Sequence, residues 1–270
     1  GKTAIFNLLT GLHQKVSNYP GITVEKKFGI IDLLDEKSIH ILDLPGSYSL
    51  TSETFDEHVV SDEIFSWIHG EEKPNIILSV VDVENLSRNL YFTSQLLDLG
   101  IPVIVVLNMM DRIQKNTLPV SVEQLKERLG AIDVVPVSAL ENQGIDRLKD
   151  SIITNLNSPL KPNDKDIPFE ITGVLRSAIR PLFQFFSEKM KFPSRFAWAQ
   201  SLRIISRKET IKLYESGNSD NFSLNKEKLI ELYKIHSDVQ QNLNGNTQDP
   251  STLEPQLRYR WIDGILRKKE

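Results

Sequence analysis

The sequence predicts an α/β fold, in which a doubly wound, mostly parallel sheet is followed by a small all-helical domain. Over residues 1–158, short β-branched runs alternate with amphipathic helices, the pattern of a sheet covered by helices on both faces. Two of these runs, 76–81 and 103–107, are apolar on both faces, as buried parallel strands are. After a polar, Pro-punctuated linker at 159–168, the apolar residues of 169–270 recur only at helical spacing.

The individual elements follow from the same patterns. We expect strands at 27–34, 38–43, 76–82, 103–108 and 134–138. We expect a first helix that stops at Gly11, and then helices at 55–67, 85–99, 122–129, 145–155, 171–186, 196–205, 226–241 and 253–266. Ser121 with Gln124, and Ser251 with Glu254, have the spacing of capping boxes. Ligand-binding loops are expected at the carboxyl ends of the strands.

Composition excludes several classes of protein. Hydrophobic and charged contents of 40% and 25% in 270 residues are typical of a soluble globular protein. The net charge of −4 argues against a general nucleic-acid-binding function. There are no cysteines, which excludes disulfides, thiolate metal sites and thiol catalysis and is consistent with a cytosolic setting. The longest apolar run, around 101–107, is too short to span a membrane.

Five short segments occur in the order that builds a guanine-nucleotide pocket. Each alone is common by chance, but their joint occurrence with strand–helix units between them predicts binding of GTP and GDP. The segments are Gly1-Lys2-Thr3, Gly21-Ile22-Thr23-Val24-Glu25, Asp43-Leu44-Pro45-Gly46, Asn108-Met109-Met110-Asp111 and Ser138-Ala139-Leu140.

The first segment matches the end of a phosphate-binding loop, G-x-x-x-x-G-K-[ST], so the chain is expected to begin within that loop. Backbone N–H groups of Gly1 to Thr3 would open a helix whose positive end faces phosphate. Lys2 would lie across the β- and γ-phosphates, and the Thr3 hydroxyl would ligate Mg²⁺. An ordinary helix that begins with a lysine is the alternative for this segment taken alone.

Two further segments are expected to complete the phosphate site. The Asp43 carboxylate would hold Mg²⁺ through a water, and the Gly46 N–H would meet the γ-phosphate. The Thr23 hydroxyl would join the Mg²⁺ shell only when a γ-phosphate is present, so that its loop acts as an order–disorder switch. A plain strand-end turn is the alternative for Asp43 to Gly46, and a plain surface loop is the alternative for Thr23.

The last two segments are expected to select the base. The Asp111 carboxylate can accept hydrogen bonds from guanine N1–H and N2–H₂, a donor pair that adenine lacks. The Ala139 N–H can donate to guanine O6. A capping or loop role is the alternative for Asn108 and Asp111. Ser47 stands where many GTPases have a glutamine that orients water, so we assign no catalytic residue and expect slow hydrolysis, or hydrolysis with a borrowed group.

Longer stretches around these segments resemble the N-terminal cytoplasmic part of the bacterial ferrous iron transport protein B (FeoB) family. The resemblance lies in residues 6–11, 18–25, 43–50, 81–91, 100–102 and 108–111, and the tail 258–263 is similar to the segment just before the membrane portion of that family. It covers nearly all of residues 1–158 closely and the helical domain loosely.

The resemblance implies a Ras-like P-loop GTPase domain followed by a GDI-like helical domain that slows GDP release. It implies Mg²⁺ as cofactor, and K⁺ as an activator in those members that carry an asparagine in the phosphate loop, a position that lies before Gly1. It places this fragment at the cytoplasmic face of the bacterial inner membrane, regulating or driving Fe²⁺ uptake. The implied partners are the protein's own C-terminal transmembrane domain, small accessory proteins of the iron-uptake system and further copies in a homo-oligomer.

Two features concern the membrane and iron. The cations Arg258, Arg260, Arg267, Lys268 and Lys269 crowd the C-terminus, as cytoplasmic charges that flank a membrane span do. Cations also favour a helix C-terminus, which is the alternative. The five histidines are scattered without ligand spacing, so we expect no iron site in this fragment.

Two other functional classes stay open. A ribosome-assembly or tRNA-modifying GTPase would need an RNA-binding appendage, and the acidic balance of the chain does not favour one. A regulatory module that binds nucleotide without hydrolysing it is compatible with Ser47 in place of the glutamine.

Overall fold

The computed structural model describes residues 1–11, 14–18, 25–32, 38–50, 55–69, 73–113, 118–157, 166–215, 224–243 and 249–267. The strands are β1 Gln14–Asn18, β2 Glu25–Asp32, β3 Ser38–Asp43, β4 Ile77–Asp82, β5 Val103–Asn108 and β6 Asp133–Pro136. The helices before residue 158 are α1 Lys2–Thr10, α2 Phe55–His69, α3 Leu86–Leu97, α4 Val122–Leu129 and α5 Ile145–Asn157, with 3₁₀ turns at Val83–Asn85 and Met110–Arg112. Later helices are α6 Gly173–Gln184, α7 Ser194–Ser206, α8 Lys226–Leu243 and α9 Leu253–Leu266; a π-helical turn covers Phe185–Lys189, and 3₁₀ segments cover Lys208–Tyr214 and Pro250–Thr252.

The strands β4, β5 and β6 form a parallel sheet, in the order β4-β5-β6. Every residue of β5 is buried, which confirms the prediction for 103–107, whereas buried and half-buried residues alternate along β4. Val103, Val105 and Leu107 pack into the cluster that contains α3 and α4. Ile104 and Val106 point the other way, into the cluster that contains α1 and α5. The alternation of side chains along one strand therefore places helices on both faces of this sheet.

The strands β1, β2 and β3 form a separate antiparallel sheet. Half of the described strands are therefore antiparallel, whereas we predicted one mostly parallel sheet. β1 was not predicted, because its sequence Gln-Lys-Val-Ser-Asn is polar and its strand conformation comes from pairing with β2. Helix α1 packs on β2 at Gly29, where a Cβ atom would lie 2.2 Å from the Cγ2 of Thr10. Gly29 therefore allows the close approach of α1 to this sheet.

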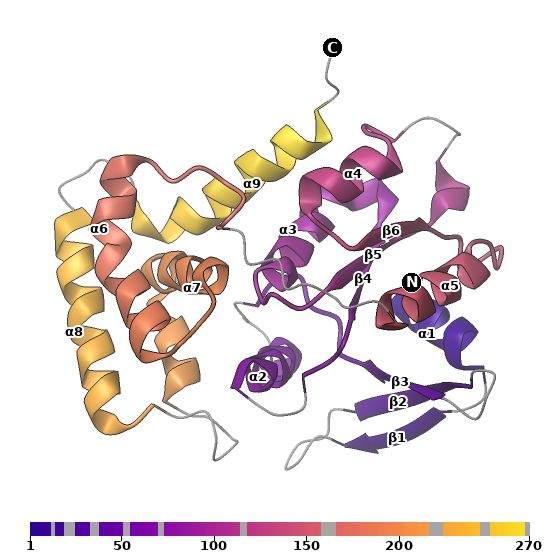
Figure 1. The fold of residues 1–270 in the computed structure, drawn as a ribbon, viewed down its shortest axis with the longest axis horizontal. Coiled ribbons are helices and arrows are strands. Elements are labelled where there is room, and N and C mark those ends of the chain that lie inside the picture. The colour runs from indigo at the N-terminus through magenta and orange to yellow at the C-terminus, as the bar shows by residue number, and fades with distance from the viewer. Residues whose placement is uncertain are drawn as a thin grey trace.

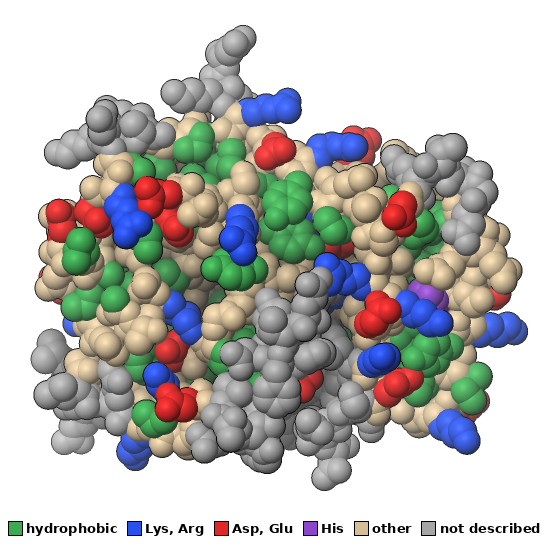
Figure 2. Space-filling model, turned by 180° about the vertical axis from the view of Figure 1, so that it is seen from behind, with side chains coloured by type: hydrophobic (Ala, Val, Ile, Leu, Met, Phe, Trp, Pro, Cys, Tyr) green, Lys and Arg blue, Asp and Glu red, His purple; other side chains and the backbone are tan. Residues whose placement is uncertain are grey.

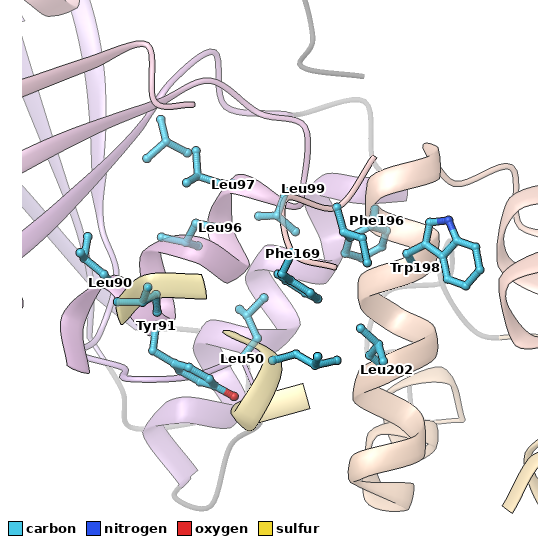
Figure 3. Packing of buried hydrophobic residues seen from close by; sticks show 14 of the residues in the cluster. Leu50, Leu90, Tyr91, Leu96, Leu97, Leu99, Phe169, Phe196, Trp198 and Leu202 are labelled. Carbon is cyan, nitrogen blue, oxygen red and sulfur yellow. The ribbon is translucent and has the colours of Figure 1, made fainter. Parts of the chain in front are cut away.

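The helices after residue 166 pack side by side and also against α3, as the left half of Figure 1 shows. In Figure 3, Leu50 and Phe169 lie between Tyr91 and Leu96 of α3 on one side and Leu202 of α7 on the other. All five belong to one continuous cluster of buried apolar residues that reaches from the parallel sheet to α9. The helical part therefore shares its hydrophobic core with the sheet-containing part.

Two expectations for the C-terminal helix α9 are wrong. Ser251 and Glu254 do not form a capping box; Asp249 caps the 3₁₀ turn before α9 instead. The other predicted capping box, Ser121 with Gln124, is present at α4. The Glu254 side chain is buried beside Arg258, which is itself 0% exposed and ion-paired with Asp98. Arg258 is thus a core residue and cannot be one of the exposed cations beside a membrane. Among the described residues, no helix combines the length and the hydropathy of a membrane span.

We predict that Gly29→Ala destabilises the fold by about 1–3 kcal/mol, because the added methyl group overlaps Thr10 and moves α1 away from β2. Urea unfolding monitored by circular dichroism measures the change. Gly264→Ala is the matched control: nothing lies within 4 Å of its Cβ position on α9, so it should stabilise the protein by about 0.5–1 kcal/mol. Equal effects of the two substitutions would contradict this packing.

Candidate nucleotide site

The first and third predicted segments meet at the N-terminus of α1. The Lys2 Nζ lies 2.7 Å from Asp43 Oδ1, and the side chains of Lys2 and Asp43 are 38% and 9% exposed. Asp43 is the last residue of β3, and Gly1 is the N-cap of α1 without a side-chain cap. Unpaired N–H groups at a helix N-terminus and a lysine beside it favour negatively charged groups. This corner of the molecule can therefore hold an anion with a cation next to it.

The fourth segment lies directly beside the first. A Cβ atom on Gly1 would be 3.3 Å from the Asn108 Nδ2 and 3.8 Å from the Met109 Cε. Asn108 ends the buried strand β5 and is 3% exposed. Its Oδ1 accepts a hydrogen bond from the Ala139 N–H at 3.1 Å, so Asn108 joins the first segment to the fifth.

The fourth and fifth segments are joined a second time through Asp111. Met109 has a φ of 67°, in the left-handed region, and the chain turns there so that Asp111 faces the loop after β6. The Ser138 hydroxyl donates to Asp111 Oδ1 at 2.5 Å and accepts the Glu141 N–H at 3.1 Å. Ser138 is 2% exposed, whereas Asp111 is exposed. A buried hydroxyl thus orients a carboxylate that faces solvent.

The loop that follows β6 is closed by Ser138 of the fifth segment together with Gln143 and Gly144, which the motifs did not indicate. Ser138 and Gln143 exchange two backbone hydrogen bonds of 3.0 Å. Gly144 has a φ of 77°, and a Cβ atom there would lie 2.3 Å from the Pro136 carbonyl oxygen. Only a glycine fits this position, and the glycine after an Asn-x dipeptide was the available signal.

Some predicted residues are placed elsewhere or not at all. Gly21, Ile22, Thr23 and Val24 lie outside the described residues, and the exposed Glu25 opens β2 and pairs with Lys27 at 3.3 Å. In the other segments, Thr3, Gly46 and Leu140 are exposed, Leu140 at 86%. Leu44, Pro45 and Met110 are half-buried around the site.

Directly after Gly46, the side chains of Ser47 and Tyr48 both have partners. The Ser47 hydroxyl donates to the Ser49 carbonyl at 2.6 Å. The Tyr48 ring lies under the Arg88 guanidinium, 4.1 Å from its carbon. The Leu50 N–H donates to the Gln95 side-chain oxygen at 2.8 Å, which attaches this segment to α3.

A charged pair at the edge of the site was also missed. Arg112, which directly follows Asp111, forms an ion pair with Glu84 at 3.0 Å. The hydrogen bond and the charge of Glu84 raise the pKa of Arg112. Both side chains are exposed, so the pair contributes little to stability.

The residues at the corner of Lys2 and Asp43 suit a hard divalent cation. The Thr3 hydroxyl and the Asp43 carboxylate are oxygen ligands of the kind that Mg²⁺ prefers. The Lys2 ammonium rests on Asp43, so this carboxylate already attracts a positive charge. Elsewhere in the described part of the chain, no three histidine, aspartate or glutamate side chains gather as a metal site.

Comparison with known proteins identifies the family. A family model described as "Ferrous iron transport protein B" matches residues 1–152. The chain belongs to this family. Curated members are "Fe(2+) transporter FeoB" of Escherichia coli K12, 42% identical, and of Salmonella typhimurium, 44% identical, each over 153 residues. These matches cover 55% of this chain and 19% of the relatives' length, so the chain spans only a small part of those transporters.

Solved structures of FeoB proteins extend the similarity to the helical part. A point mutant of S. thermophilus NFeoB, bound to mGDP, has a TM-score of 0.75 and 30% identity and covers 98% of this chain and 94% of its own. The cytosolic domain of L. pneumophila FeoB has a TM-score of 0.73 and 31% identity, with 98% and 93% coverage. The FeoB G-domain fold, a mixed α/β unit with a parallel sheet followed by a helical region, is therefore confirmed for this chain.

We predict that Ser138 and Asp111 are energetically coupled in solution. In a double-mutant cycle of Ser138→Ala and Asp111→Ala, measured by urea unfolding, the interaction free energy should be about 1 kcal/mol or more, because a hydrogen bond to a carboxylate is lost in both single variants. Effects that add to within about 0.3 kcal/mol would contradict this hydrogen bond.

Proposed function

We propose that this chain binds GTP and GDP with Mg²⁺ and hydrolyses GTP slowly, as the nucleotide-binding part of a ferrous iron transporter. The observation that carries the proposal is the convergence of four segments far apart in sequence. Lys2 touches Asp43, Gly1 lies beside Asn108, and Asn108 and Asp111 are hydrogen-bonded to the Ala139 and Ser138 of one loop. The FeoB structures bound to GDP or mGDP support the same ligand class.

Recognition of guanine is assigned to Asp111 and Ala139. The exposed Asp111 carboxylate, oriented by Ser138, would accept hydrogen bonds from guanine N1–H and N2–H₂. The Ala139 N–H donates to Asn108 Oδ1 in the structure. On binding, the same N–H would turn to guanine O6, and Asn108 would remain as the support between the base loop and Gly1.

Phosphate binding is assigned to the N-terminus of α1. The N–H groups of Gly1 to Thr3 and the Lys2 ammonium would contact the β- and γ-phosphates. Lys2 would then exchange its contact with Asp43 for one with phosphate, and Thr3, Asp43 and, with GTP, Thr23 would hold Mg²⁺. When bound, this ion supplies neutralisation of the phosphate charge. The Gly46 N–H would meet the γ-phosphate.

Slow hydrolysis follows from the residues after Gly46. Ser47 is bonded to Ser49, and Tyr48 is stacked against Arg88, so neither is placed as a base. Since neither Ser47 nor Tyr48 is free to orient the water, we propose that a borrowed group does so, from the rest of the phosphate loop, from a partner or from a bound cation such as K⁺. A non-hydrolysing switch is the competing reading, and a multiple-turnover phosphate-release assay separates the two: turnover at background level favours the switch.

The proposed GDI-like role of the helical domain is supported by its link to this segment. Gln95 accepts the Leu50 N–H and donates from its Nε2 to Glu254 of α9 at 3.2 Å. A shift of the segment after Gly46 would disturb the position of α9 through this single side chain. We infer that the nucleotide state and the position of the helical domain are coupled at Gln95. The two coupled units are the proposed domains, residues 1–158 and residues 169–270.

At the level of the whole protein, we propose that this part lies at the cytoplasmic face of the bacterial inner membrane and regulates or drives Fe²⁺ uptake. The relatives are Fe²⁺ transporters, and one solved relative is described as a cytosolic domain. Its partners would be a C-terminal transmembrane domain, small accessory proteins and further copies of itself. An RNA-directed GTPase is less supported, because cationic and anionic side chains are interspersed on the described part of the face shown in Figure 2.

Asp111→Asn tests the base pocket. Asparagine pairs less well with the two guanine donors, so GDP affinity should fall by roughly 10–100-fold. Xanthine presents one donor and one acceptor at the same edge, which match the asparagine amide, so affinity for xanthosine diphosphate should rise. Titration calorimetry measures both, with the exposed Asp238→Asn on α8 as control. Loss of GDP binding with no gain for xanthosine diphosphate would count against this pocket.

The link to iron is tested in cells that carry the full-length protein. Asp111→Asn should abolish Fe²⁺ uptake while the protein stays in the membrane at its normal level, and Asp238→Asn should leave uptake unchanged. Normal uptake by the Asp111 variant would show that this pocket is not coupled to transport.

A further inference from the structure

A cluster of buried charges lies where α3, α7 and α9 meet, away from the nucleotide site. Within the part of the chain whose burial is described, the buried carboxylates are Asp98 and Glu254, and the buried arginines are Arg195, Arg203 and Arg258, each 3% exposed or less. The cluster therefore holds one positive charge in excess. A buried charge that is not compensated costs several kcal/mol, so the excess requires an explanation.

Two of the three arginines are paired. Arg258 donates to Asp98 Oδ2 at 2.5 Å and also to the Glu254 carboxylate. Arg195 donates from Nε to Asp98 Oδ1 at 2.8 Å. Glu254 further accepts the Tyr91 hydroxyl at 2.6 Å. These contacts use both carboxylates to hold α3, α7 and α9 together.

Arg203 is the arginine in excess. It is 1% exposed, and none of its three guanidinium nitrogens has a hydrogen-bond partner in the structure. Burial lowers the pKa of Arg203, and the charge of Glu254 opposes this shift without a direct hydrogen bond. Because a guanidinium does not lose its proton in proteins, Arg203 stays charged and has five N–H donors to satisfy.

The surroundings of Arg203 offer further donors. Gln200, one helical turn earlier on α7 and fully buried, has an Nε2 without a partner, while its Oε1 accepts the Tyr214 hydroxyl at 3.2 Å. Gln200 and Arg203 are three residues apart on α7, a spacing that places both side chains on the same face of the helix. The unsatisfied groups of Gln200 and Arg203 are all donors. A water molecule would bring two donors of its own and no charge, whereas an anion supplies acceptors and the missing negative charge.

We propose that Arg203 and Gln200 of α7 form a buried binding site for one small monovalent inorganic anion of the chloride type. One negative charge balances the cluster, and the near-complete burial of both side chains favours a small ion over an organic acid or a phosphate ester. The bound anion stabilises the junction of α7 with α3 and α9. Arg203 and Gln200 are not among the residues assigned to guanine-nucleotide binding.

Bromide is the probe for the position of the ion. Crystals of the 270-residue protein soaked in sodium bromide should give an anomalous peak within hydrogen-bonding distance of both Arg203 and Gln200. The peak should be absent from Arg203→Met and present in Arg260→Met, which removes an exposed arginine of α9. A guanidinium of Arg203 paired directly with Glu254, with no peak beside it, would overturn the proposal.

Thermal unfolding in chloride and in gluconate at equal ionic strength tests the site in solution. The melting temperature of the wild type should be higher in chloride by about 2–4 °C. Gln200→Glu places a carboxylate beside Arg203 without changing side-chain size, so it should raise the melting temperature in gluconate and abolish the difference between the two salts. This variant keeps the test valid if Arg203→Met does not fold. The same chloride response in wild type and Gln200→Glu would refute an anion at this position.

Discussion

The rest of the structure depends on the complete burial of β5. A strand that is buried on both faces has no place for a polar side chain along its length, so polar groups are confined to its ends. Asn108 is the first polar residue that the strand reaches, and it lies where β4 and β6 also end. The helices α1 and α5 cover one face and α3 and α4 the other. The same exclusion of polar groups thus builds the core and gathers the nucleotide site at one edge.

Within the site, the side chains of Asn108 and Ser138 each contact two other groups. Asn108 lies against Gly1 and binds the Ala139 N–H, and Ser138 binds both Asp111 and the Glu141 N–H. Such shared contacts hold loops from different strands in register without a ligand. They also make the loops dependent on one another, because loss of one side chain leaves two partners unsatisfied.

Much of this arrangement was predictable from sequence, and the exceptions have physical causes. Strands and helices with strong apolar periodicity, such as Val103–Asn108 and Leu253–Leu266, begin and end where predicted. The polar strand β1 was missed because pairing, not residue preference, forms it. Glu254 was predicted to form a capping box and Arg258 to be a cation beside a membrane, but each is buried with partners more than 150 positions away in the sequence. No local pattern contains that information.

The core shared between the two parts of the chain limits how members of this family can be recombined. Tyr91 and Leu96 of α3 belong to the same close-packed apolar cluster as Phe169 and Leu202 of α7, so changes on one side of this cluster require matching changes on the other. A chimera that takes its helical part from a distant relative would bring apolar side chains and buried charges that do not match α3. Such a chimera should fold only when α3 is taken from the same relative as the helical part.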